Sequence, residues 1–81
     1  MKEIRLTPRI EEHDYETKKQ QAERILKSGD SVLLVVKVSG KEGAAAKALL
    51  EELLRDLKPL GRPKSGIHVS GKQADVQVDS G

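Results

Sequence analysis

Four segments of the chain have the residue pattern of β-strands. In three of them apolar and polar residues alternate, and a period of two is typical of a strand with one buried face. The second segment is apolar throughout from Val32 to Val36, which predicts a central strand. Pro8 has no backbone donor, so the first segment is predicted to be an edge strand or to end near this residue. The four segments are residues 2–10, 31–38, 67–70 and 73–79.

Between the first two strands, apolar residues recur at the spacing of an amphipathic helix. We predict a helix over residues 15–28. Asp14 is its predicted N-cap, because its carboxylate can accept from the free backbone N–H groups of the first turn. Gly29 predicts the end of the helix, because glycine adopts the left-handed conformation at low cost. The apolar stripe is thin and consists of Tyr15, Ala22, Ile25 and Leu26.

A second helix is predicted between Ser39 and Pro59. Ser39 and Glu42 have the spacing of a capping box, in which each side chain bonds the backbone N–H of the other residue. Pro59 and Gly61 end the helix. Its polar face carries Glu and Arg side chains, and its apolar face is the clearest amphipathic pattern in the chain. The apolar face consists of Ala46, Leu49, Leu50, Leu53, Leu54 and Leu57.

The predicted order of elements is β-α-β-α-β-β, with a hairpin turn at Ser70 and Gly71 between the last two strands. Crossovers between parallel strands are right-handed, so both helices should lie on one face of a mixed sheet. The predicted fold class is therefore α/β (α+β), a two-layer sandwich with a four-stranded mixed sheet whose second face is largely open. Residues 1–81 are predicted to form a single domain, because 81 residues are too few for two cores.

Composition excludes several classes of site. The chain has no cysteine, which excludes disulfides, iron–sulfur clusters and thiolate zinc sites, and its two histidines show no ligand spacing. No metal or cofactor is therefore predicted. With one tyrosine and no Phe or Trp, the chain lacks the aromatic side chains on which single-strand binders stack bases. No apolar run approaches the roughly 18 residues of a membrane span, and the N-terminus does not resemble a signal peptide. We expect a cytoplasmic protein with no membrane partner.

No catalytic constellation is present in the sequence, so we predict neither an enzyme nor a small-molecule substrate. There is no G-x-S-x-G motif, and Ser39-Gly40-Lys41 and Ser70-Gly71-Lys72 lack the spacing of a phosphate-binding loop. His13 and Asp14 are adjacent in sequence, and a loop that leads into a helix cap explains them more simply than a catalytic pair. Tyr15 is either a packing residue with a solvent-exposed hydroxyl or part of a binding surface, and the sequence leaves both interpretations open.

The distribution of charge is more informative than its sum. Fifteen Lys and Arg residues against thirteen Asp and Glu residues give a net charge of only +2, which argues weakly for a polyanionic partner. Residues 57–74 and 37–41 nevertheless contain no acid. If the fold brings these turns together, they form a basic rim suited to phosphates. Alternatively, the lysines only keep the loops soluble. The residues concerned are Lys37, Lys41, Lys58, Arg62, Lys64, His68 and Lys72.

The first thirty residues also carry a motif with specific spacing. The matching residues are Lys2-Glu3-Ile4-Arg5-Leu6, Pro8, Ile10, Glu12-His13-Asp14-Tyr15, Thr17-Lys18 and Leu26-Lys27-Ser28-Gly29-Asp30. In this order they resemble the start of the C-terminal domain of bacterial translation initiation factor 3. The order of elements is similar to that domain's as well, and in length the resemblance covers essentially the whole chain.

The second half departs from the family's pattern at charged positions. The family's Phe-Arg-Gly-Arg-Glu type motif is replaced by Val38-Ser39-Gly40-Lys41-Glu42. One arginine is therefore lost, and Lys41 keeps the charge of the other without its bidentate fork. In the last hairpin Gly71-Lys72-Gln73 stands where the family has Gly-Arg-Gln. Asp75 and Asp79 then add negative charge where the family is neutral.

The resemblance implies a module that binds the small ribosomal subunit, mainly through rRNA, and acts in translation initiation and subunit anti-association. It implies contacts with phosphates and recognition of RNA shape. The alternative is a divergent or redesigned domain that keeps the fold, has lost rRNA binding and serves as a structural or protein-interaction scaffold. In either case a monomer is expected. The candidate RNA-binding residues are Tyr15, Lys18, Lys41 and Lys72 by resemblance, then Lys2 and Arg5, and from the basic rim Lys37, Arg62 and Lys64.

Overall fold

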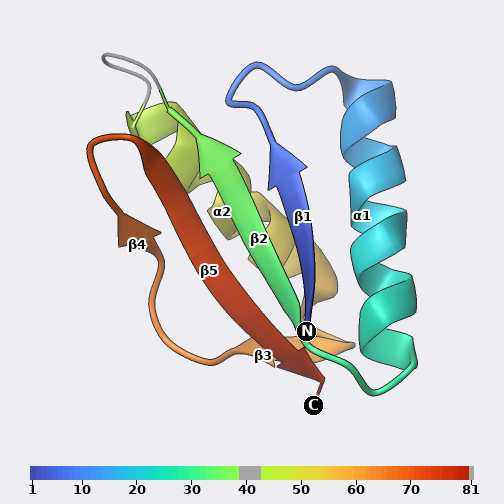
Figure 1. The fold of residues 1–81 in the computed structure, drawn as a ribbon. Helices are drawn as coiled ribbons and strands as arrows, with labels where there is room; N and C mark the ends of the chain where they lie inside the picture. The colour runs from blue at the N-terminus through green and yellow to red at the C-terminus, as the bar shows by residue number, and fades with distance from the viewer. Residues whose placement is uncertain (39–42, 81) are drawn as a thin grey trace.

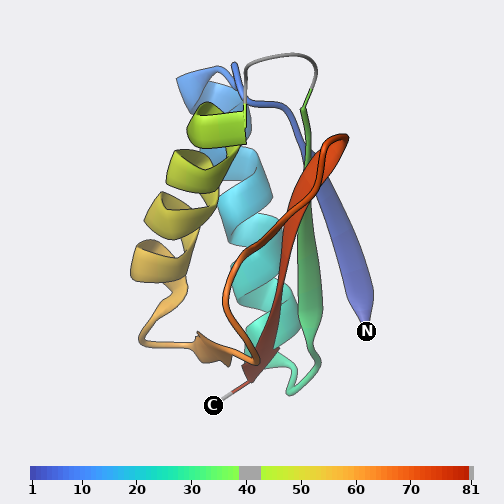
Figure 2. The ribbon, with the colours of Figure 1, turned by 90° about the vertical axis from the view of Figure 1, so that its left-hand side faces the viewer.

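The computed structural model describes residues 1–38 and 43–80, in which two helices pack against one face of a mixed sheet (Figure 1). Turning the view shows both helices in one layer and the sheet in the other, with no helix on the second face of the sheet in the described residues (Figure 2). The predicted two-layer α+β class is therefore confirmed. The elements are β1 (Lys2–Leu6), α1 (Glu12–Lys27), β2 (Val32–Lys37), α2 (Gly43–Leu57), β3 (Gly61–Pro63), β4 (His68–Val69) and β5 (Gln73–Ser80).

The sheet is mixed because β1 runs parallel to β2 whereas β5 runs antiparallel to it. One edge of β5 pairs with β2, and the other pairs with β4 and then with β3. Counted over the described ranges, the sheet has five strands and not the predicted four. The additional strand is β3. It escaped prediction because glycine and proline within three residues are typical of a turn, and only the free edge of β5 supplies its hydrogen-bond partners.

The core lies between the sheet and the two helices. Every second residue of β1, β2 and β5 points into it, and the predicted apolar faces of both helices pack on these residues. Burying a Val or Leu side chain contributes about 1.5–3 kcal/mol, so this layer is the main source of stability. The buried side chains are Ile4, Leu6, Ala22, Leu26, Val32, Leu34, Val36, Ala46, Leu49, Leu50, Leu53, Leu57, Ala74, Val76 and Val78.

The start of α1 differs from the prediction. The helix begins at Glu12, and Glu11 occupies the N-cap position without a capping hydrogen bond from its side chain. The prediction that Asp14 is the N-cap is therefore wrong. Asp14 lies in the first turn instead, where its carboxylate and that of Glu12 are favoured by the positive end of the helix dipole. An acidic residue suits both places, so its identity alone did not fix the first residue of the helix.

The end of α1 follows the prediction. Gly29 has a φ of 87°, the only positive φ among the described residues. Its N–H donates to the carbonyl of Leu26 at 3.1 Å, and the N–H of Asp30 donates to the carbonyl of Ile25 at 3.1 Å. These two bonds form a Schellman motif, which satisfies carbonyls at the end of the helix and turns the chain towards β2.

The remaining boundaries agree in part with the sequence. β1 ends at Leu6, before Pro8, and not at Ile10, which packs against the core from the connection to α1. The predicted hairpin is present: the N–H of Ser70 donates to the carbonyl of Gln73 at 2.7 Å. The capping box predicted at Ser39 and Glu42 lies outside the described residues.

Candidate nucleic-acid interface

Two exposed lysines from segments far apart in the sequence lie at the same end of the sheet. β2 ends at Lys37, which stands opposite Gln73, the first residue of β5. The backbone N–H of Val38 donates to the carbonyl of Lys72 at 3.0 Å, which fixes the hairpin turn against the end of β2. Neither Lys37 nor Lys72 has an ion-pair partner in the part of the chain that the structure describes. The prediction for Lys41 lies outside the described residues.

The first turns of α1 lie at the same end of the molecule, on the far side of β1 from the hairpin (Figure 1). Lys18 is half-buried here, and its side chain makes no hydrogen bond or ion pair with another described residue. Its neighbour Lys19 instead pairs with Glu16, with 3.1 Å between Nζ and Oε2. Of the two adjacent lysines, Lys18 is therefore the one whose charge stays available to a partner.

Tyr15 belongs to the contact between the two helices. Its hydroxyl donates to Oδ2 of Asp56 at 2.6 Å and so links the first turn of α1 to the last turn of α2. Burial raises the pKa of Tyr15, and the hydrogen bond to Asp56 raises it further. The charges of Glu52 and Glu16 act in the same direction. The expectation of a packing ring is confirmed. The hydroxyl has a protein partner as well, and the surroundings of the ring are acidic.

Three other candidates lie towards the opposite end of the sheet. Lys2 stands opposite Val32 at the start of β2, and Arg62 stands opposite Asp79 near the end of β5. The backbone N–H of Lys64 donates to the carbonyl of Gln77 at 2.8 Å. The structure therefore does not bring these three cations together with Lys37 and Lys72.

Arg5 lies on the open face of the sheet, beside Val35. Its Nε donates to Oε1 of Glu3 at 2.8 Å. That hydrogen bond, together with the charge of Glu3, raises the pKa of the guanidinium. Because the carboxylate partly neutralises the guanidinium, Arg5 offers a phosphate less than its formal charge suggests.

The two acids in the last strand have different positions. Asp79 accepts from the hydroxyl of Ser31 at 2.8 Å and from Nε2 of Gln77 at 3.0 Å, and these bonds lower its pKa. Asp79 therefore fastens the end of β5 to the start of β2, far from Lys72. Asp75 is closer to the hairpin and accepts from Nε2 of Gln73 at 3.1 Å.

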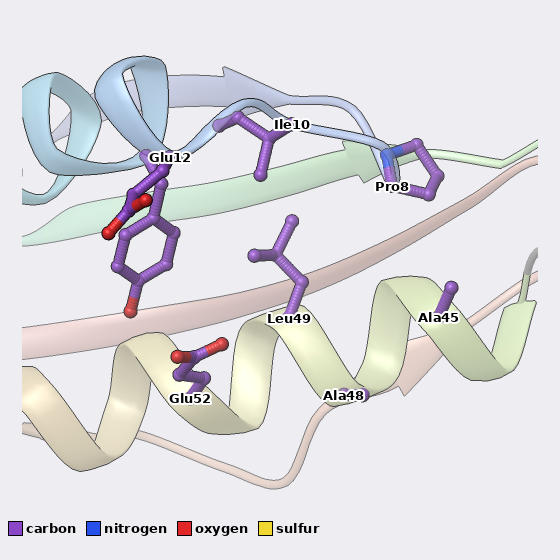
Figure 3. A pocket seen from close by; sticks show the side chains of 8 residues that line it. Pro8, Ile10, Glu12, Ala45, Ala48, Leu49 and Glu52 are labelled. Atoms are coloured by element: carbon purple, nitrogen blue, oxygen red, sulfur yellow. The ribbon is translucent and has the colours of Figure 1, made fainter.

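The structure also contains a groove that the sequence did not predict. It lies between α2 and the connection from β1 to α1, and its volume is about 550 Å³. Figure 3 shows Ile10 and Leu49 pointing towards one another across it, with Glu12 and Glu52 at one end. The only sequence signal for the groove is the run of alanines near the start of α2, whose short side chains leave space beside the helix. Its lining residues are Pro8, Ile10, Glu12, Tyr15, Ala45, Ala48, Leu49 and Glu52.

No group of three or more His, Cys, Asp or Glu side chains in the described ranges is arranged to hold a metal ion. No helix in the same ranges has the length and apolar character required to cross a membrane.

Comparison with known proteins identifies the family. Residues 1–80 match the family described as Translation initiation factor IF-3, C-terminal domain. Translation initiation factor IF-3 of Trichormus variabilis is 37% identical over 75 residues, which cover 89% of this chain and 42% of that protein. The protein of the same name from Nostoc punctiforme is 42% identical over 64 residues, 75% of this chain and 36% of that protein. The chloroplastic factor of Cyanidium caldarium is 36% identical over 75 residues, 89% of this chain and 40% of that protein.

The chain thus spans about two-fifths of the length of the curated relatives it matches. The family is one of translation factors and not of enzymes. The motif of the first thirty residues, the order of the elements and the match over residues 1–80 agree with one another. This chain belongs to the family of the C-terminal domain of translation initiation factor IF-3.

Proposed function

We propose that this domain binds the small ribosomal subunit through the phosphates of its rRNA and acts as a monomer in translation initiation in the cytoplasm, where it opposes subunit joining. The observation that carries the proposal is the position of Lys37 and Lys72 at the same end of the sheet, where the bond from Val38 to the carbonyl of Lys72 holds the hairpin against the end of β2. Two unpaired ammonium groups at a hydrogen-bonded end of the sheet suit a phosphate backbone, because the backbone that carries them is already ordered and little loop entropy is lost when they bind.

The other candidates have graded roles in this proposal. Lys18 adds a third unpaired cation at the same end of the molecule, at the start of α1. Lys41 belongs to the segment between β2 and α2 and is proposed as a contact by resemblance. Tyr15 supports this end by holding α1 to α2, and its ring remains a proposed contact. The remaining candidates contribute only through the electrostatic field of the domain. Arg5 is paired with Glu3. The other three lie far from Lys72 and are Lys2, Arg62 and Lys64.

The test is binding to purified small ribosomal subunits over a salt series. Lys37→Ala and Lys72→Ala should each weaken binding about threefold to tenfold and lower the slope of log K against log salt by about one. Lys27→Ala is the matched control, because Lys27 is also exposed and has the same charge but ends α1 at the other end of the molecule. Equal effects of all three substitutions would contradict the proposed interface, since they would indicate only a response to net charge.

A second candidate function is a structural or protein-interaction domain that has lost rRNA binding. The observation in its favour is the pairing of Arg5 with Glu3, together with Asp75 two pairs from the hairpin turn. Under this hypothesis the folded domain would fail to bind small subunits even at low salt. Asp75→Asn would then leave binding undetectable, whereas under the first proposal it strengthens binding by removing a charge that repels phosphate.

A further inference from the structure

The groove between α2 and the β1–α1 connection has an apolar floor that is partly accessible from solvent. Ile10 and Pro8 are half-buried and line one side, and Leu49 of α2, which is 8% exposed, lines the other. Ala45 and Ala48 are exposed on α2 beside Leu49. Because alanine has no side chain beyond Cβ, a partner's backbone can come close to α2 at these positions. Figure 3 shows the alanines and Pro8 towards one end of the groove, away from the glutamates.

The other end of the groove is acidic. Glu12 and Glu52 lie there from different elements, α1 and α2 (Figure 3). Both are exposed, and neither has an ion-pair partner among the described residues. Asp56 lies one turn beyond Glu52 and accepts from the hydroxyl of Tyr15. The chain as a whole is net positive, so this local negative charge is not a general property of the surface.

We propose that this groove binds a basic amphipathic helical segment of another protein. Apolar side chains of the segment would lie against Ile10 and Leu49 between the two walls. A lysine or arginine would meet the carboxylates of Glu12 and Glu52. Ala45 and Glu52 are seven residues apart on α2, which is about 10 Å at 1.5 Å per residue, so the segment presents its apolar and cationic groups about two turns apart.

Charge and shape favour this occupant over two others. An RNA strand would place phosphates beside Glu12 and Glu52, and like charges in contact are unfavourable. A second copy of the chain has no suitable helix in the described ranges, because the apolar faces of α1 and α2 are already buried in its own core. Its exposed large apolar side chains there are Met1 and Val69, and neither lies in a helix. Tyr15 lines the groove and is also a proposed rRNA contact, but the lysines that carry the rRNA proposal do not line the groove, so either inference can fail without the other.

The probe is a synthetic helical peptide with leucines at helical spacing and lysines elsewhere. Tyr15 lines the groove and is the only aromatic residue of the chain, so tyrosine emission reports binding at this place directly. One control peptide has the same composition with its leucines distributed around the helix, and another has glutamates in place of the lysines. The amphipathic basic peptide should bind at least about tenfold more tightly than either control at low salt, and added salt should weaken its binding.

Matched variants locate the contact. Glu52→Lys should weaken peptide binding about tenfold. Glu51→Lys makes the same charge change on the neighbouring residue of α2, which lines a different hollow with Arg55 and Arg62, and should change binding less than about twofold. Ala48→Gln fills the groove with a neutral side chain and should also weaken binding, whereas Ala44→Gln lies outside the groove lining. Both alanines are exposed helical positions, so both variants should keep the wild-type circular dichroism spectrum.

Several results would overturn the inference. Equal binding of the amphipathic and redistributed peptides would mean that only charge is recognised. Equal effects of Glu52→Lys and Glu51→Lys would place the contact elsewhere. A concentration-dependent dimer in sedimentation that disappears in Ala48→Gln would mean that a second copy fills the groove. Tighter binding of an RNA oligonucleotide than of the peptide, with loss in Ala48→Gln, would assign the groove to nucleic acid.

Discussion

Gly61 stands where β3 meets β5 and the end of α1. It is buried and pairs with Ser80. A Cβ atom added at this position would lie 2.6 Å from the carbonyl oxygen of Asp79 and 3.1 Å from both terminal methyl groups of Leu26. Carbon–oxygen contacts in proteins rarely come closer than about 3.3 Å, so the overlap with the carbonyl is about 0.7 Å. Since that oxygen belongs to the backbone, it cannot rotate away, and β3 must move from β5.

The energetic cost of Gly61→Ala follows from this movement. Overpacking in a core costs about 1–3 kcal/mol, and each hydrogen bond weakened between β3 and β5 adds about 0.5–1.5 kcal/mol. We therefore expect a loss of about 3 kcal/mol in the free energy of unfolding. A domain of this size has about 4–12 kcal/mol in total. At about 4–8 °C per kcal/mol, the midpoint of thermal unfolding should fall by about 12–24 °C.

The assay is thermal and urea unfolding followed by circular dichroism, with Gly66→Ala as the matched control. Gly66 lies between β3 and β4, has no positive φ, and a Cβ there meets no atom within 4 Å. This control should be neutral or more stable by up to about 1 kcal/mol, because alanine restricts the unfolded chain. If the two variants unfolded at the same midpoint, the close approach of β3 to β5 would not be a property of the protein in solution.

Three further predictions concern α1 and the end of the sheet. Burial and the hydrogen bond to Asp56 raise the pKa of Tyr15 above the ordinary 10.0. Ultraviolet titration of this single tyrosine should therefore show phenolate forming only above that pH, and Asp56→Asn should lower the transition. The folded state's preference for the neutral phenol stabilises it fully below pH 10.0, and this contribution is lost above that pH. Gly29→Ala should cost about 1 kcal/mol in urea unfolding, because φ is 87° although the space is free. Hydrogen bonds from Ser31 and Gln77 lower the pKa of Asp79 from 3.8. The contribution of this carboxylate to folding stability is therefore complete well above pH 3.8 and is lost as the pH falls through the lower pKa of the folded state. Asp79→Asn should reduce the drop in thermal midpoint on acidification.

The sequence by itself determined the local elements and the family. The apolar stripe of α2, the alternation in β5 and the glycine that ends α1 are repeats and caps that neighbouring residues impose on one another. They were predicted because their physical causes act within a few residues. The motif of the first thirty residues pointed to the family that the match over residues 1–80 then showed.

The tertiary structure decided what depends on distant residues. β3 exists because β5 offers a free edge, although its own three residues favour a turn. The hydroxyl of Tyr15 donates to a residue 41 positions away. The cations of the predicted basic rim are divided between two ends of the sheet. The groove likewise needs α2 beside the β1–α1 connection. Each of these features depends on groups that come into contact only when the chain has folded. The spacing of residues along the sequence does not show which distant groups will be in contact.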